Sequence, residues 1–130
     1  IAAGMFEGNF LMVNEGGNFE HYEADTGDSV EVHLTSWAST WFDADNDGWE
    51  DLHVCTGFSV YTNYPTILSQ YPDVPDQFFW NQEGAFEEDD SGLFDANVLS
   101  FSSASSDYNL DGFPDLFSKK AKSPASMWSN

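Results

Sequence analysis

The chain has 130 residues and a formal net charge of −20, because 23 acidic side chains face only three lysines. A charge of that sign repels nucleic acids and anionic membranes, so both are poor candidates for a partner. Hydrophobic residues make up 41% of the chain and aromatic residues 17%, which provides a core and excludes a disordered acidic tail. The length suits one domain, and no apolar run is long enough to span a membrane.

The first predicted element is a hairpin. Residues 10–14 and 18–23 are rich in apolar side chains and flank a Gly-Gly pair, which is typical of two antiparallel strands joined by a turn. A linker over 24–34 follows it. Residues 36–42 form the next predicted strand, which leads into an acidic loop.

This loop, residues 43–51, has the pattern Asp-x-Asp-x-Asp-Gly-x-x-Asp. Side-chain oxygens therefore stand at positions 1, 3, 5 and 9 of the loop. Ca²⁺ binds about six to eight oxygens, and alternate residues of a tight loop can direct them at one point. The glycine at position 6 suits a sharp turn, and the residue at position 7 can add its backbone carbonyl.

The loop differs from an EF-hand in two respects. Position 12 is Val54 where an EF-hand has a bidentate Glu, and residues 51–56 alternate like a strand rather than a helix. The pattern therefore predicts a calcium site between two strands. An acidic β-turn without a cation is the alternative, since Asp-Gly pairs are common in hairpins. The four aspartates at positions 1, 3, 5 and 9 would then repel one another.

The second half of the chain repeats these elements. After an insertion over 61–75 that is rich in Tyr and Pro, residues 77–81 and 85–89 form a second predicted hairpin. Residues 99–106 are predicted to enter a second acidic loop. That loop is Asp107-Tyr108-Asn109-Leu110-Asp111-Gly112-Phe113-Pro114-Asp115, and the strands at 114–118 and 126–129 follow it.

The spacing of the two features indicates an internal repeat. From Asn14 to Asn81 is 67 positions, and from Asp43 to Asp107 is 64. Each unit has four strands, which is typical of a β-propeller blade. The sequence therefore predicts an all-β fold of antiparallel four-stranded blades with calcium-binding hairpin loops.

In this interpretation the chain holds about two blades of an incomplete propeller, namely one complete blade between two partial ones. Residues 1–35 end one blade and add a linker, 36–98 form a complete blade with the 61–75 insertion, and 99–130 begin the next. A propeller closes with about four to eight blades. We therefore expect the partners to be the remaining blades of a longer chain or other copies of this one.

Residues 39–54 resemble an FG-GAP/VCBS repeat, particularly of the cartilage-acidic-protein type. Residues 14–19 and 81–86 resemble the Asn-x-Gly-x-Gly-x-Phe hairpin that alternates with that repeat. The resemblance covers most of the chain outside 24–34 and 61–75. It implies an integrin-α-like β-propeller, secreted or at the cell surface, with Ca²⁺ in its blade hairpins.

Carried over residue by residue, the resemblance implies two sets of ligands. The first set is the side chains of Asp43, Asp45, Asp47 and Asp51 with the carbonyl of Trp49, and the second is the side chains of Asp107, Asn109, Asp111 and Asp115 with the carbonyl of Phe113. The chain departs from the family after each exit strand, where Gly-Ala-Pro is replaced by Thr56-Gly57 and by Ser118-Lys119-Lys120.

Other chemistry has little support in the sequence. The three histidines, His21, His33 and His53, lack the spacing of a zinc site and are predicted to be strand-surface or packed residues. Cys55 is predicted to be a buried thiol. Ser59 lacks the final glycine of a nucleophile elbow, and the geometry of glycosidase carboxylate pairs is not readable from sequence. We therefore expect no enzyme.

The predicted function is that of an extracellular or cell-surface calcium-binding module with a structural, adhesion or protein-interaction role. One alternative is a lectin-like propeller that binds a glycan, with Tyr61, Tyr64 and Tyr71 of the insertion as its best candidates. Another is a non-catalytic part of a secreted enzyme.

Overall fold

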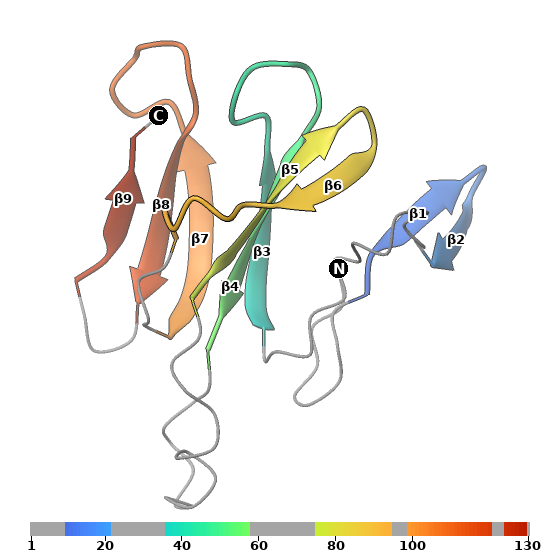
Figure 1. The fold of residues 1–130 in the computed structure, drawn as a ribbon, viewed down its shortest axis with the longest axis horizontal. Coiled ribbons are helices and arrows are strands. Elements are labelled where there is room, and N and C mark those ends of the chain that lie inside the picture. Colours follow the sequence, from blue (N-terminus) through green and yellow to red (C-terminus); the bar gives the residue numbers. More distant parts are fainter. Residues whose placement is uncertain (1–9, 22–35, 58–74, 95–98, 121–123, 130) are drawn as a thin grey trace, which may run out of the picture.

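The computed structural model describes residues 10–21, 36–57, 75–94, 99–120 and 124–129. In these ranges the chain forms nine β-strands and no helix, so they include no helix that could cross a membrane. The strands form antiparallel sheets of two, four and three strands (Figure 1). The prediction of an antiparallel all-β fold is confirmed. The sequence also predicted two strands before residue 36, four in 36–98 and three after it, and the three sheets have these numbers of strands.

Within each sheet the strands pair in chain order. The first sheet pairs β1 (Met12–Glu15) with β2 (Asn18–His21), the second contains β3 (Ser36–Phe42), β4 (Asp51–Thr56), β5 (Gln77–Gln82) and β6 (Ala85–Glu88), and the third contains β7 (Ser100–Ser106), β8 (Asp115–Lys120) and β9 (Ser126–Trp128).

Strand β4 is buried on both of its faces. Every one of its residues is buried, because β3 and β5 flank it and other elements cover its two sides. Leu52 and Val54 pack with Leu11, which precedes the first hairpin. His53 and Cys55 alternate with them and so point to the other side, where they contact Ser103 of β7. The sequence of β4 alternates as in a half-buried strand, yet both sets of side chains are buried.

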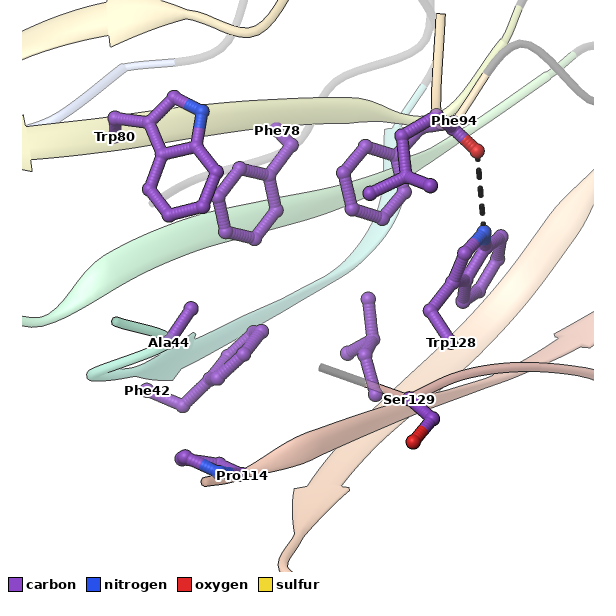
Figure 2. A pocket seen from close by; sticks show the side chains of 10 residues that line it. Phe42, Ala44, Phe78, Trp80, Phe94, Pro114, Trp128 and Ser129 are labelled. Carbon is purple, nitrogen blue, oxygen red and sulfur yellow. Dashed lines mark hydrogen bonds between the residues drawn. The ribbon is translucent and has the colours of Figure 1, made fainter. Parts of the chain in front are cut away.

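An aromatic core joins the second and third sheets. Phe78 of β5 stacks on Phe94 with ring centroids 4.9 Å apart, and Leu116 of β8 packs in the same cluster. These rings line a cavity of about 90 Å³. Figure 2 shows Trp128 beside Phe94 at the edge of this cavity. The indole N–H of Trp128 donates to the Leu93 carbonyl at 3.1 Å. The two sheets therefore share one core.

The second and third sheets are structural repeats of each other. Both have a register shift at the same place in their first strand pair, within 36–38 and within 100–102. Both then continue in step to the acidic loop, where the last pairs are Phe42↔Asp51 and Ser106↔Asp115. All of these positions are related by the 64-residue offset seen in the sequence.

The hairpin turns explain the repeated Asn. Asn14 and Asn81 each accept a hydrogen bond through Oδ1 from the backbone N–H three residues later, at 2.9 and 2.8 Å. The turn at residues 83–84 has φ values of 56° and 96°, as the tight two-residue hairpin turn requires. The side chain of Asn thus fixes the turn that each hairpin needs.

The predicted and observed strand ends differ slightly. β1 spans Met12–Glu15 instead of 10–14, and β8 begins at Asp115 instead of Pro114. β2 lies within the predicted 18–23, of which residues 22–23 lie outside the described part of the chain. Pro114 lies outside the strand pairing, so its missing N–H removes no hydrogen bond from the sheet. The predicted linker over 24–34 and residues 61–74 of the insertion lie outside the described residues.

The second and third sheets approach each other closely at Gly57, and a substitution there tests this approach. Its φ is +126°, and a Cβ on it would lie 2.7 Å from the Cα of Leu99. We expect Gly57→Ala to lower the free energy of unfolding by about 3 kcal/mol, from backbone strain and from this clash. Urea unfolding measures the loss.

Gly16→Ala is the matched control. Gly16 also has a positive φ, of +63°, but no described atom lies within 4 Å of the position that a Cβ would take there. Only the backbone strain remains, so the expected loss is about 1 kcal/mol. Equal losses in the two variants would contradict the close approach at Gly57.

Candidate metal centres

The two acidic loops, residues 43–50 and 107–114, lie at the same end of the molecule (Figure 1). Each connects the first two strands of its sheet. The side-chain amide of Asn46 donates to the carbonyl of Gly112 at 2.9 Å, so the loops also touch each other. Two clusters of negative charge are therefore held side by side.

The first loop folds around its own aspartates. Asp43 accepts hydrogen bonds from the backbone N–H groups of Asp47 and Gly48, at 3.0 and 2.9 Å. Asp45 also accepts from the N–H of Asp47, at 3.1 Å, and Asp47 accepts from the N–H of Trp49 at 2.8 Å. These contacts hold the side chains at positions 1, 3 and 5 on the inner side of the turn.

The second loop forms the same hydrogen bonds. Asp107 accepts from the N–H groups of Asp111 and Gly112, at 3.1 and 2.9 Å. Asn109 accepts from the N–H of Asp111, and Asp111 accepts from the N–H of Phe113, both at 2.9 Å. Two stretches 64 residues apart thus adopt one conformation, which a chance acidic turn does not require.

The ninth position closes each loop from the start of the next strand. Asp51 is 2% exposed and Asp115 is 3% exposed. One carboxylate oxygen of each accepts a backbone N–H from position 2 of its loop, at 2.9 Å. The other oxygen of Asp51 accepts the N–H of Asn81 at 2.8 Å. Asp51 therefore connects the loop to the hairpin of β5 and β6.

Carboxylates converge in the first loop. Asp43, Asp45 and Asp51 each offer an oxygen, and these oxygens lie within 4.8 Å of one another. This group can hold a metal ion. Burial raises the pKa of the Asp51 carboxyl, and the charges of Asp45 and Asp47 add to the rise, while its two backbone hydrogen bonds oppose it. A cation would offset both the burial and the repulsion.

All ten predicted ligand residues lie in the described part of the chain. The side chains at position 7, Trp49 and Phe113, are 44% and 41% exposed and carry no oxygen that could bind the ion. The predicted ligand at this position is the backbone carbonyl. Asn109 stands where the first loop has Asp45 and contributes an amide oxygen instead of a carboxylate. The assignment of these ten residues as ligands stays a prediction.

A second group with metal-ligand atoms lies in the interior. Nitrogen, sulfur and oxygen atoms of His53, Cys55 and Asp76 also lie within 4.8 Å of one another, and all three residues are buried. Burial raises the pKa of the Cys55 thiol to about 11, and the nearby Asp76 carboxylate adds to the rise. Sequence reasoning treated His53 and Cys55 separately and missed the group. Their i, i+2 spacing on one strand was the available signal.

Comparisons with known proteins add no assignment. No protein-family model, curated protein or solved structure matches the chain. The resemblance to FG-GAP/VCBS repeats therefore stays a prediction that rests on the sequence.

Position 4 of the second loop offers a test of the shared conformation. Asn46 and Leu110 occupy this position with φ values of 61° and 63°. Asn adopts this left-handed conformation readily, whereas Leu is strained in it by about 1–2 kcal/mol. Leu110 is 86% exposed, so packing gives no reason for it. We expect Leu110→Asn to raise the free energy of unfolding by about 1 kcal/mol, measured in urea with calcium present.

Asn46→Leu is the reciprocal variant. It should lower the free energy of unfolding, because it adds the strain and removes the hydrogen bond to Gly112. A Leu110→Asn protein no more stable than the wild type would contradict the equivalence of the two loops.

Proposed function

We propose that the two acidic loops bind Ca²⁺ and that the chain is a calcium-stabilised repeat module of β-propeller type. The observation that carries this proposal is the recurrence of one set of side-chain-to-backbone hydrogen bonds in both loops. It is supported by the convergence of three carboxylates in the first loop.

Ca²⁺ is the cation that these ligands suit best. The candidate ligands are all oxygens, and most are charged, which favours a hard cation. Mg²⁺ requires a stricter octahedron and usually keeps several waters, whereas Ca²⁺ tolerates an irregular loop with many protein oxygens. Because Asp51 and Asp115 begin β4 and β8, a bound ion would fix the loop to the sheet.

The propeller assignment is supported by the way in which the two repeated sheets pack. Their first strands lie against each other: the hydroxyls of Thr40 and Ser103 are 2.7 Å apart, and Trp37 and Phe101 meet edge to face at 5.3 Å. The outer face of the third sheet exposes Phe117 (46%) and Met127 (49%). A further blade, from a longer chain or another copy, would cover this face.

An extracellular or cell-surface location follows from the proposed chemistry. Extracellular calcium modules work at about 10⁻⁴–10⁻³ M, where loosely built oxygen sites are filled. The role is then structural or adhesive and not catalytic, with a protein or glycan as the ligand. The tyrosines of the lectin alternative, Tyr61, Tyr64 and Tyr71, lie outside the described residues, so no structural observation favours that alternative.

Calorimetric titration with Ca²⁺ tests the proposal. The wild-type chain should bind two ions. Asp47→Ala and Asp111→Ala should each bind one, because each variant removes the carboxylate at position 5 of one loop. Asp90→Ala is the control, since Asp90 is exposed and lies outside both loops, and it should still bind two.

The proposal fails if the wild-type chain releases no binding heat at millimolar Ca²⁺ and equilibrium dialysis also detects no bound ion. It also fails if both loop variants keep two ions, because the ions would then lie elsewhere.

A further inference from the structure

The buried group of His53, Cys55 and Asp76 lies in the interface between the second and third sheets. His53 and Cys55 are 0% exposed and Asp76 is 4% exposed. The first two stand on one face of β4, and Asp76 directly precedes β5. The rings of Phe94 and Trp128 border the imidazole, with centroids 5.6 and 6.1 Å from its own. The polar side chain of His53 is therefore packed partly against aromatic rings.

The imidazole of His53 is satisfied on one side only. Its Nδ1 lies 3.0 Å from the hydroxyl of Ser103, at hydrogen-bonding distance. Its Nε2 is buried and has no hydrogen-bond partner among the described residues. The nearest charged atom is Oδ2 of Asp76 at 3.6 Å, which exceeds the normal length of an N–H···O bond.

Neither tautomer of His53 gives Nε2 a good hydrogen bond with the described residues alone. If Nδ1 carries the proton and donates to Ser103, the lone pair of Nε2 faces the carboxylate of Asp76. If Nε2 carries the proton, its N–H is too far from that carboxylate to bond well. Burying such an unsatisfied polar group destabilises the folded state. A cation between the two atoms removes the conflict in the first state.

The distances suit a tetrahedral metal. With bonds of about 2.1 Å to nitrogen and oxygen, two ligands of a tetrahedral Zn²⁺ lie about 3.4 Å apart. The observed separation of Nε2 and Oδ2 is 3.6 Å. The sulfur of Cys55 is the third ligand atom of the group, in which the nitrogen, sulfur and oxygen atoms lie within 4.8 Å of one another. The hydroxyl of Ser103 contacts both His53 and Cys55 and would orient the imidazole as an outer partner.

The second repeat shows that the fold does not require these three residues. Phe117, Lys119 and Ala125 stand at the positions that correspond to His53, Cys55 and Asp76. That sheet forms the same register with none of the three ligand types. Asp76 has structural partners, since it accepts hydrogen bonds from the backbone N–H of Thr56 and from the hydroxyls of Ser100 and Ser118. The buried His53 and Cys55 beside it call for an explanation other than strand pairing.

A nucleophilic role explains the group less well. A Cys-His-Asp arrangement can catalyse acyl transfer only if substrate reaches a thiolate. Cys55 is fully buried, and its raised pKa keeps the thiol protonated at neutral pH. Structural metal sites, in contrast, are commonly enclosed.

We propose that His53, Cys55 and Asp76 form a buried site for a Zn²⁺-like divalent transition metal, distinct from the two calcium loops. Thiolate, imidazole and carboxylate together are a typical zinc ligand set, whereas Ca²⁺ takes oxygen ligands only. The three protein ligands leave the fourth position to a water molecule. On binding, the thiol gives its proton to solvent and the metal–sulfur bond replaces the S–H bond.

Co²⁺ substitution tests this site, since tetrahedral Co²⁺ with a thiolate ligand absorbs visible light and shows a sulfur-to-metal charge-transfer band. The whole chain is refolded with one equivalent of Co²⁺ in excess Ca²⁺, so that the loops are filled and the interior is accessible. We expect one Co²⁺ per chain with both bands, and the addition of Zn²⁺ should abolish them.

Variants identify the ligands. Cys55→Ser should remove the charge-transfer band, and His53→Phe, which carries the residue of the second repeat, should remove both bands, as should Asp76→Asn. His21→Gln is the control and should keep the wild-type spectrum, because His21 lies in β2 of the first sheet. A charge-transfer band that persists in Cys55→Ser, or a wild-type chain without bands, overturns the proposal.

A second measurement covers variants that do not fold. In the wild-type chain, bound Zn²⁺ should slow the alkylation of Cys55 by iodoacetamide at a urea concentration just below the unfolding transition. The same rate with Zn²⁺ and with EDTA, at constant Ca²⁺ activity, would show that the thiol binds no metal and would overturn the proposal.

Discussion

Electrostatic repulsion among clustered carboxylates is the constraint on which the rest of the structure depends. Each acidic loop turns its aspartates toward its own backbone N–H groups, and the first loop also brings three of them within 4.8 Å. Backbone hydrogen bonds offset part of this repulsion, but they also fix the side chains where the repulsion is strongest. A divalent cation at each loop would resolve the conflict, and this is the reason for the proposal that calcium is a part of the fold.

The loops matter because of what they join. Asp51 closes the first loop and begins β4, which is buried on both faces, and it also accepts the backbone N–H of Asn81. The side chain of Asn81 in turn donates to the Glu50 carbonyl and accepts from Gly84 in the next hairpin turn. Loop, central strand and hairpin are therefore one connected unit. This connection gives a physical reason why the acidic loop and the Asn hairpin recur together along the chain.

Much of this architecture was predictable from the sequence, because its signals are local. The strands 36–42 and 51–56 were predicted with their observed bounds from alternation and from the loop between them. The interior metal-ligand group was not predictable in the same way. Asp76 is separated from Cys55 by the whole insertion, and the packing of the third sheet and Phe94 against β4 encloses the group. Burial that depends on a neighbouring sheet leaves no periodic trace in one strand. The proposed propeller also lies beyond local signals, since its closure would need blades in addition to these three sheets.

The most direct test of the central claim is thermal unfolding in excess EDTA and in millimolar Ca²⁺ at matched ionic strength. A ligand that binds only the folded state raises its stability by about 2.7 kcal/mol at a concentration of 100 Kd. Two structural sites should therefore raise the melting temperature by many degrees, and the rise should grow with calcium concentration. The same melting temperature in both solutions would mean that the carboxylates are tolerated without a cation, and the account of the loops as structural metal sites would be wrong.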